Sequence, residues 1–185
     1  MDTKVFLEKN KYYLLSAAIL LGTVFLIWRM MEFRSKIKVS NGETIDSLSV
    51  PDINGNLISL QSFHGKIVLL HFWASWCGPC RHEAPEVVQL YRDFHGMHYN
   101  GAADFEIFSI SLDDNRSKWL NAIDNLNFFW ENHGSELNGW DNSLTRRFQI
   151  NSIPATLLLD ENGKVIGNNL DIPDIRKILE ERLTD

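Results

Sequence analysis

The stretch IVLLHFWASWCGPC, residues 67–80, decides the fold of this chain. Its first seven residues form a near-continuous apolar run, which is typical of a parallel central strand covered on both faces. Cys77 and Cys80 follow directly and are the only two cysteines in the chain. Because α/β sheets place their sites at the carboxyl ends of their strands, the pattern predicts a buried strand that ends at a cysteine pair.

The spacing of Cys77 and Cys80 suits redox chemistry. A disulfide needs two Cβ atoms within about 4.5 Å, and the first turn of a helix brings residues i and i+3 that close. A helix N-terminus also offers unpaired N–H groups and positive potential, which favour a thiolate. We therefore predict that Cys77 is the attacking thiolate and that Cys80 is the thiol that resolves the mixed disulfide.

Two plainer interpretations of the cysteine pair are a zinc half-site and an inert local disulfide. A zinc site normally needs four ligands, and the chain has no second pair of cysteines. A disulfide that closes so short a loop removes little entropy from the unfolded chain. The pattern therefore favours a redox-active disulfide, and we expect no metal.

The rest of the chain alternates strand and helix patterns. Helical spacing of apolar residues follows Cys80 and ends at His95-Gly96, with Pro85 inside it. Residues 127–130 are consistent with a short strand, and residues 131–143 with a loop. The other expected elements are a hairpin over 49–60, strands at 105–112, 155–160 and 165–167, a helix after 113–115, helical turns at 144–148 and a final helix from Pro173. This order predicts an α/β fold with a mixed sheet.

The N-terminus carries the pattern of a membrane anchor. Residues 14–28 are uncharged and largely apolar, and with Tyr12 and Tyr13 they approach the lower end of the usual span of about 17–25 residues. A cleaved signal peptide would need small residues after the apolar run, and RMMEF at 29–33 is a poor site. We expect a tail (1–11), a single transmembrane anchor (12–28), a polar tether (29–47) and one domain (48–185).

Charge restricts the partners and says little about orientation. The net charge of -6 argues against nucleic acid as a partner, since binding phosphates calls for a basic face. Basic residues are nearly balanced on the two sides of the anchor, so the positive-inside rule does not decide which side the domain occupies. A short lysine-bearing tail that stays inside would place the domain outside the cytoplasm. We expect single-pass attachment to the cytoplasmic (inner) membrane, with the domain on the periplasmic side.

Several motifs together resemble the thioredoxin fold. They are FWASWCGPC at 72–80, Ile153-Pro154 at the head of a strand, and the DENGK hairpin at 160–164. The details are similar to the TlpA/ResA-like branch of membrane-anchored thiol–disulfide oxidoreductases, which has a DINGN turn like that at 52–56 and a C-R-x-E-x-P pattern like that at 80–85. The resemblance covers about residues 48–185. It implies a mixed central sheet flanked by helices, with an N-terminal β-hairpin extension.

The resemblance also implies roles for residues near the cysteine pair. A proline at the head of a strand is either an edge residue or part of a cis bond, and the family implies that Pro154 is cis and packs against Cys77 and Cys80. The backbone of Ile153 would then pair with an extended substrate segment. Trp76 either lines the substrate approach or only packs on the surface, and both interpretations stay open.

Glu83 and His71 are further candidates. Glu83 follows Cys80 by three residues, so on a helix the two share a face. The family assigns to this position an acid that accepts the proton of the resolving thiol; the alternative is an acid that merely complements the helix dipole. Cytoplasmic thioredoxins carry a buried acid where this chain has His71, so a proton-transfer role there is in doubt, and a neutral buried histidine is expected.

These observations predict a protein-disulfide oxidoreductase that acts on protein thiols and disulfides, with Gly78-Pro79 resembling the reducing thioredoxins. No cofactor is expected, because electrons travel as thiols, and the family implies a membrane electron donor. One alternative is a thiol peroxidase, but its P-x-x-x-T-x-x-C pattern is missing around Cys77. Another is a non-catalytic binding module that keeps its disulfide.

Overall fold

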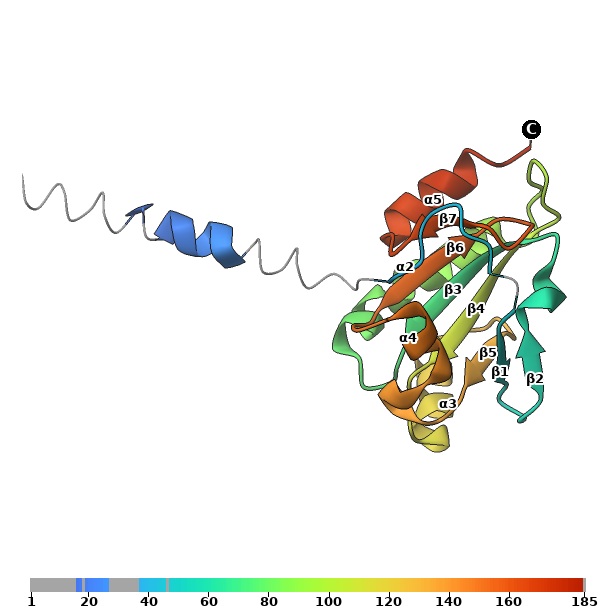
Figure 1. Ribbon diagram of the computed structural model, residues 1–185, viewed down its shortest axis with the longest axis horizontal. Coiled ribbons are helices and arrows are strands. Elements are labelled where there is room, and N and C mark those ends of the chain that lie inside the picture. The colour runs from blue at the N-terminus through green and yellow to red at the C-terminus, as the bar shows by residue number, and fades with distance from the viewer. Residues whose placement is uncertain (1–15, 18, 27–36, 46, 185) are drawn as a thin grey trace, which may run out of the picture. The chain divides into compact units, whose positions relative to one another are not determined.

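The computed structural model describes residues 16–17, 19–26, 37–45 and 47–184. The chain divides into two units, residues 1–34 and 35–185, and Figure 1 labels the helices and strands of the second. The described part of the first unit is helical, and no helix within the described residues has the length and apolar character needed to cross a membrane. Of the predicted anchor, residues 12–28, the positions 12–15, 18, 27 and 28 lie outside the described part of the chain.

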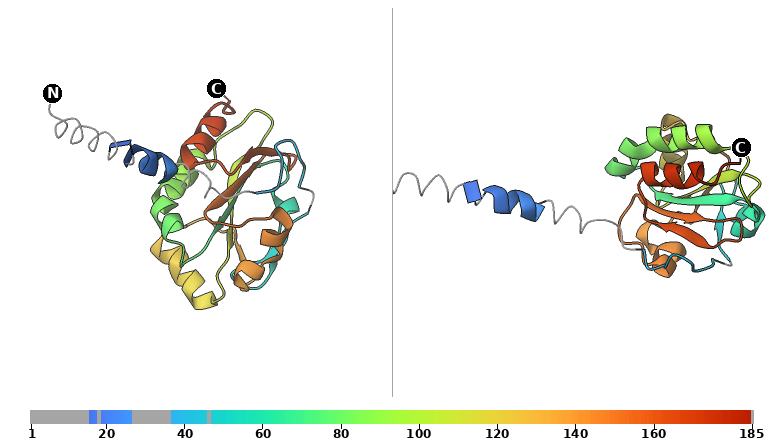
Figure 2. Two further views of the ribbon diagram at one scale, coloured as in Figure 1. Left: turned by 60° about the vertical axis from the view of Figure 1, so that its left-hand side comes forward. Right: turned by 90° about the horizontal axis from the view of Figure 1, so that it is seen from above.

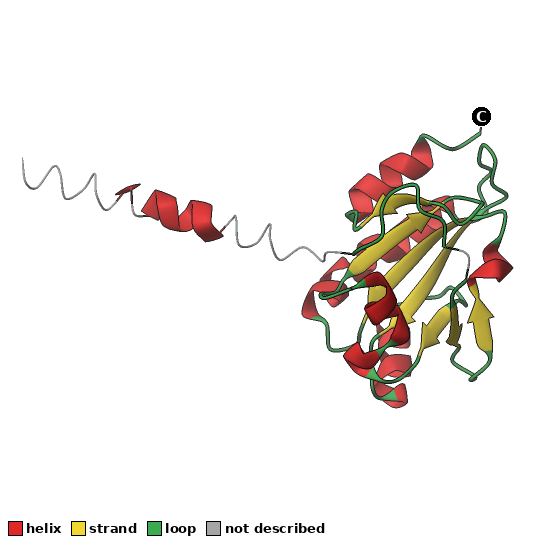
Figure 3. Cartoon of the chain, viewed as in Figure 1, coloured by secondary structure: helices red, strands yellow, loops and turns green. Residues whose placement is uncertain are grey.

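The second unit is built on a mixed sheet of five strands (Figure 3). In spatial order they are β5 (His133–Ser135), β4 (Phe105–Ser111), β3 (Ile67–Trp73), β6 (Ala155–Leu159) and β7 (Val165–Asn168). β3 lies at the centre, parallel to β4 and antiparallel to β6. Every residue of β3 is buried, as its apolar run predicts for a strand covered on both faces. The predicted mixed sheet, with a central strand that leads to the cysteine pair, is confirmed.

Helices cover both faces of the sheet (Figure 2, right). The helices are α2 (Gly78–Phe94), α3 (Arg116–Asn125), α4 (Ser143–Phe148) and α5 (Ile172–Glu180). Side chains of β3 alternate between the two faces. Leu69 and Trp73 join the core beneath α2, α3 and α5, whereas Leu70 and Phe72 join the core beneath α4. His71 has the parity of Leu69 and Trp73, so it belongs to the face covered by α2.

A hairpin precedes β3, as predicted. β1 (Ser49–Pro51) and β2 (Leu57–Ser59) pair antiparallel, and the 3-10 helix η1 (Leu60–Phe63) follows. Gly55 in the turn has a φ of 88°, a conformation that glycine adopts without steric cost. Val50 is fully buried on the same side of the sheet as α4, so the hairpin is part of the domain core.

Residues 37–45, part of the expected polar tether (29–47), pack on the domain. Ile37, Val39 and Ile45 are buried. Backbone N–H groups of this segment donate to carbonyls of α4 and β7. The packed part of the domain therefore extends upstream of residue 48. The few aliphatic side chains are spread among polar residues, so the composition did not reveal a segment that packs through alternate positions.

The short strand expected at residues 127–130 is absent from the structure, and β5 lies a few residues later. Asn127 has a φ of 55°, which interrupts an extended backbone at the start of this segment. Phe128 and Trp130 instead bury their rings, stacked 4.7 Å apart between centroids, in the core beneath α2. Their apolar character reflects core packing rather than a place in the sheet.

Candidate active site

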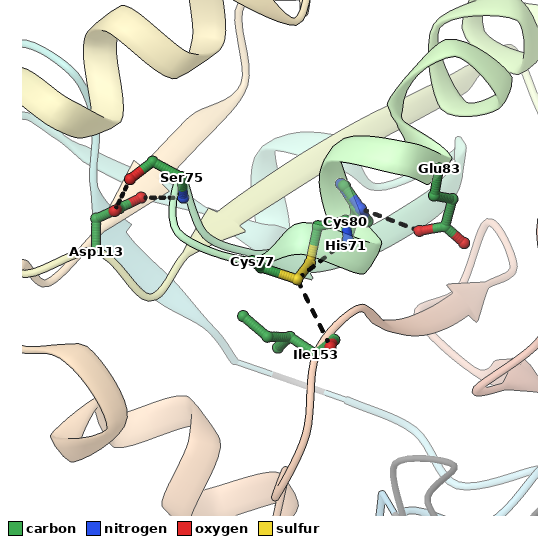
Figure 4. The surroundings of a disulfide bond; sticks show 7 residues. All are labelled: His71, Ser75, Cys77, Cys80, Glu83, Asp113 and Ile153. Carbon is green, nitrogen blue, oxygen red and sulfur yellow. Dashed lines mark hydrogen bonds and ion pairs between the residues drawn. A yellow bond between two sulfur atoms is a disulfide. The ribbon is translucent and has the colours of Figure 1, made fainter. Parts of the chain in front are cut away.

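The cysteine pair lies where the central strand passes into α2 (Figure 4). Cys77 is the N-cap of α2, and Cys77 and Cys80 form a disulfide. The backbone N–H of Cys80 donates to Cys77 Sγ at 3.1 Å, so the sulfur lies against an N–H that the helix itself leaves unpaired. Cys77 is 4% exposed and Cys80 is 1% exposed. The predicted placement of the pair at a helix N-terminus is confirmed, and Cys80 is the more buried sulfur.

A buried carboxylate holds the loop that leads to the disulfide. Asp113, at the end of β4, accepts hydrogen bonds from Ser75 N at 2.9 Å and from Ser75 Oγ at 2.5 Å. Ser111 Oγ donates to the same carboxylate at 2.7 Å. Asp113 does not cap the helix that follows it; Asn115 does, by accepting from Lys118 N. The sequence feature that could have indicated the contact with Ser75 is the position of Asp113 just after β4. Adjacent parallel strands such as β3 and β4 bring their carboxyl ends together.

The strand head at Ile153-Pro154 meets the disulfide from the other side. The Ile153–Pro154 peptide bond is cis, as the family resemblance implied. Cys77 Sγ lies 3.7 Å from the carbonyl oxygen of Ile153 (Figure 4). β6 begins at the next residue, Ala155. Backbone from two distant parts of the chain therefore meets at the sulfur that was predicted to attack.

Two tryptophans form an exposed aromatic pair beside the cysteine loop. Trp76 is 51% exposed and Trp140 is 45% exposed, with ring centroids 6.1 Å apart. Trp140 lies on the 3-10 helix η2 (Gly139–Asp141), whose carbonyls accept from Thr145 Oγ1 at 2.9 Å and from Asn138 Nδ2 at 3.2 Å. The sequence predicted only a loop here, and no local pattern indicates that Trp140 approaches Trp76.

Glu83 and His71 face each other beneath α2. His71 Nε2 lies 3.9 Å from Glu83 Oε2, and within the described residues neither atom has a hydrogen-bond partner (Figure 4). Burial raises the pKa of Glu83 to about 7, and the nearby carboxylates of Glu86 and Asp171 add to the rise. Burial also lowers the pKa of His71 to about 3, with a contribution from His133. His71 is therefore neutral and fully buried, as predicted.

A separate cluster of potential metal ligands lies at the far end of α2. His95, Asp104 and Glu106 bring one ligand atom each within 4.8 Å of one another. Lys66 Nζ is 2.9 Å from Glu106 Oε1 and 3.7 Å from Asp104 Oδ2, so an ammonium group already neutralises these acids. Tyr91 also donates to Glu106 at 3.3 Å. This cluster is an ion-pair network that ties the end of α2 to β4, and it is remote in sequence from the disulfide.

Comparisons with known proteins agree with this geometry. A family model described as thioredoxin-like matches residues 65–165. The thiol-disulfide oxidoreductase ResA of Bacillus subtilis is 26% identical over 137 residues, which cover 72% of this chain and 69% of that protein. The protein of the same name from Bacillus cereus is 25% identical over 165 residues, covering 86% of this chain and 88% of the relative.

Solved structures that resemble this chain also include thiol-disulfide oxidoreductases. The thioredoxin domain of a thiol-disulfide oxidoreductase from Bacteroides vulgatus superimposes with a TM-score of 0.68 at 26% identity, covering 78% of this chain and 98% of that domain. A thiol-disulfide oxidoreductase from Bacteroides fragilis gives a TM-score of 0.66 at 26% identity, covering 75% of this chain and 98% of that protein.

Proposed function

We propose a specific reaction for this chain, which belongs to the thioredoxin-like family: reduction of disulfides in other proteins through a mixed disulfide at Cys77. The chain is a thiol–disulfide oxidoreductase, given its Cys77–Cys80 disulfide and its similarity to such enzymes. One observation supports the proposed course best. Cys77 Sγ sits at a helix N-terminus, against the Cys80 N–H, and beside the backbone of Ile153.

The proposed reaction transfers two electrons from the reduced cysteine pair to the substrate. The Cys77 thiolate attacks one sulfur of the substrate disulfide; the S–S bond of the substrate breaks, and its other sulfur leaves as a thiolate that takes up a proton. Cys80 then loses its proton and attacks Cys77 Sγ. This step forms the Cys77–Cys80 disulfide and releases the second substrate thiol. A dithiol donor must then reduce Cys77–Cys80, and we propose that a membrane electron carrier supplies it.

Glu83 is the proposed acceptor of the Cys80 proton. It lies one helical turn after Cys80 on α2, on the same face of the helix. Its pKa of about 7 lets it exist as a carboxylate at neutral pH and still bind a proton readily. A surface acid that only complements the helix dipole would not show this rise, which supports the catalytic role over the dipole role.

Ile153, Pro154 and Trp76 are the proposed substrate contacts. An extended substrate segment can pair with the backbone at Ile153, ahead of β6, by addition of a strand. Trp76, which directly precedes Cys77, and Trp140 form an exposed aromatic pair. Large aromatic side chains contribute strongly at protein interfaces because they bury much area and lose little side-chain entropy. Half-exposed tryptophans beside a reactive sulfur therefore suit a substrate carrying apolar residues near its cysteine.

Trapping tests the reaction. The reduced Cys80→Ala protein should form a stable covalent adduct with a disulfide-containing protein such as insulin, and dithiothreitol should release it. The matched Cys77→Ala protein should form none. If neither variant forms an adduct, and Cys77–Cys80 in the parent protein resists dithiothreitol, the chain is a binding module that keeps its disulfide. Consumption of hydrogen peroxide without an adduct would instead indicate a thiol peroxidase.

The proposed location follows from the sequence. Residues 12–28 would anchor the chain in the cytoplasmic membrane, and residues 29–185 would lie outside the cytoplasm. Protease added to intact spheroplasts should then digest the domain. Digestion only after lysis would contradict this orientation, and recovery of the full chain in the soluble fraction would contradict the anchor.

A further inference from the structure

We propose that His71 is a positioning residue for Glu83: its imidazole donates a hydrogen bond to the Glu83 carboxylate and keeps that group ready for the proton of Cys80. This inference rests on the proposed function and deepens it, because it concerns the step in which the mixed disulfide is resolved. His71 touches neither substrate nor sulfur in this assignment, and it acts only through Glu83.

The geometry of β3 and α2 carries this inference. His71 has the same strand parity as Leu69 and Trp73, so its side chain lies on the sheet face that α2 covers. Its Nε2 atom is 3.9 Å from Glu83 Oε2 (Figure 4). The approach therefore joins the central strand directly to the first turns of the helix that carries both cysteines.

A hydrogen bond between His71 Nε2 and Glu83 Oε2 would satisfy two buried polar atoms that otherwise lack a partner among the residues described. Both imidazole nitrogens of His71 and the Oε2 atom of Glu83 are buried without a hydrogen-bond partner within the described residues. Buried polar groups in proteins are nearly always hydrogen-bonded, and leaving one unpaired is costly. Shortening this 3.9 Å separation to a hydrogen-bond distance would pair one atom on each side.

Among the residues that the structure describes, Glu83 is the acidic residue whose carboxylate lies within 4.0 Å of a His71 nitrogen. His133 on β5 lies close enough to lower the pKa of His71; its Nε2 lies 3.2 Å from the Phe128 carbonyl oxygen, and its Nδ1 is buried without a hydrogen-bond partner within the described residues. The Phe128 ring meets the His71 ring edge-on at 6.0 Å, and this contact fixes the imidazole from the side. No hydrogen bond joins His71 to His133 among the described residues, and a carboxylate accepts from either tautomer of an imidazole, so Glu83 is the acceptor that His71 faces.

Other charges act on Glu83 in the opposite sense. Glu86 on α2 and Asp171, the N-cap of α5, add to the effect of burial and raise the pKa of Glu83 to about 7. A hydrogen bond to an ionised group is roughly twice as strong as one between neutral groups. A neutral His71 that donates to the carboxylate therefore favours the ionised form and opposes the rise. The proton of Cys80 passes to Glu83, and His71 keeps its own proton throughout.

The test follows the rate of mixed-disulfide resolution against pH in a single turnover of the reduced full chain, with insulin in large excess so that resolution and not the first attack limits the rate. With His71→Leu, the midpoint of the pH profile should move up by about one unit, and the rate at pH 7 should fall up to about tenfold, since each unit is a factor of ten. The rate should recover above the new midpoint. His71→Gln keeps an amide donor of similar length and should stay near the parent midpoint.

A double variant separates the proposed role from packing. In the Glu83→Gln background, His71→Leu should slow resolution no further, because its effect passes through Glu83. An equal slowing in that background, or a fall in rate with an unchanged midpoint, would assign His71 to packing and overturn the inference. If His71→Leu does not fold, His71→Asn replaces it, because its shorter amide falls short of Glu83 and should give the same upward shift. A parent protein that forms no mixed disulfide would overturn the proposed function itself.

Discussion

The sulfur of Cys77 lies 3.7 Å from the carbonyl oxygen of Ile153, which is 76 residues further along the chain. This approach joins the N-terminus of α2 to the head of β6, because both elements border the central strand β3. A substrate segment that pairs with the backbone at Ile153 would therefore present its cysteine directly to Cys77. The mixed sheet therefore assembles the site. β3 leads into the cysteine pair, and its antiparallel neighbour β6 begins beside that pair.

Trp140 should matter for protein substrates and not for small ones. Replacing it by alanine removes one half of the exposed pair with Trp76, so kcat/KM for insulin reduction should fall by about fivefold or more, the effect of losing an aromatic contact worth about 1 kcal/mol. Reduction of a small disulfide such as oxidised glutathione should be unchanged. Phe129→Ala, at an aromatic residue that is 52% exposed and lies against the far end of α2, is the matched control. Equal losses for both substrates would mean that Trp140 supports the loop and not the substrate.

Asp113 should stabilise the cysteine loop. Asp113→Ala leaves the Ser75 N–H and hydroxyl without their acceptor in a buried setting, at a cost of about 1–3 kcal/mol in the free energy of unfolding. Chemical denaturation of the oxidised protein measures this cost. The neighbouring Asp114→Ala, at an exposed position, should change stability little. Equal effects of the two substitutions would show that the Ser75 contacts contribute nothing to stability.

The sequence revealed those parts of the fold that local patterns encode. The apolar run at 67–73 and the cysteine spacing sufficed for the central strand and the N-terminus of α2, and they led to a site that the structure assembles as expected. The roles of Asp113 and Trp140 were not predicted, because they depend on contacts with Ser75 and Trp76, which are far away in the chain. β5 was not predicted either, because its place in the sheet also depends on pairing with a distant segment. Within the five-stranded sheet it pairs with the end of β4, and its sequence, His133 to Ser135, lacks the β-branched or aromatic residues that mark a strand.

The redox potential should lie on the reducing side. Gly78-Pro79 between the cysteines resembles the reducing thioredoxins, and we expect a value below about −200 mV. Equilibration with glutathione buffers, followed by alkylation of the free thiols, measures it. A value near about −120 mV, as for a strong oxidant, would reverse the proposed direction of electron flow.

Glu83 should also make stability depend on pH. Its pKa is raised by burial from 4.5 to about 7, so the folded state holds this proton more tightly than the unfolded state does. Below about pH 4.5 the carboxyl is protonated in both states, and its burial is not penalised by charge. As the pH rises through 7, the unfolded state gains from ionisation first, and up to about 3 kcal/mol of stability is lost.

The variant Glu83→Gln removes this ionisation, so it should be more stable than the parent at pH 8 by up to about 3 kcal/mol, with the difference shrinking to near zero by about pH 4. His71 acts in the opposite sense. Because its pKa is lowered from 6.5 to about 3, it costs stability as the pH falls below 6.5, and it does so in both proteins. Urea unfolding of the oxidised proteins from about pH 4 to about pH 8 measures the difference, with Glu180→Gln at an exposed position as the control. A difference that stays constant across this range would mean that Glu83 ionises as freely in the folded protein as in the unfolded chain, and would remove the basis for its role as the proton acceptor of Cys80.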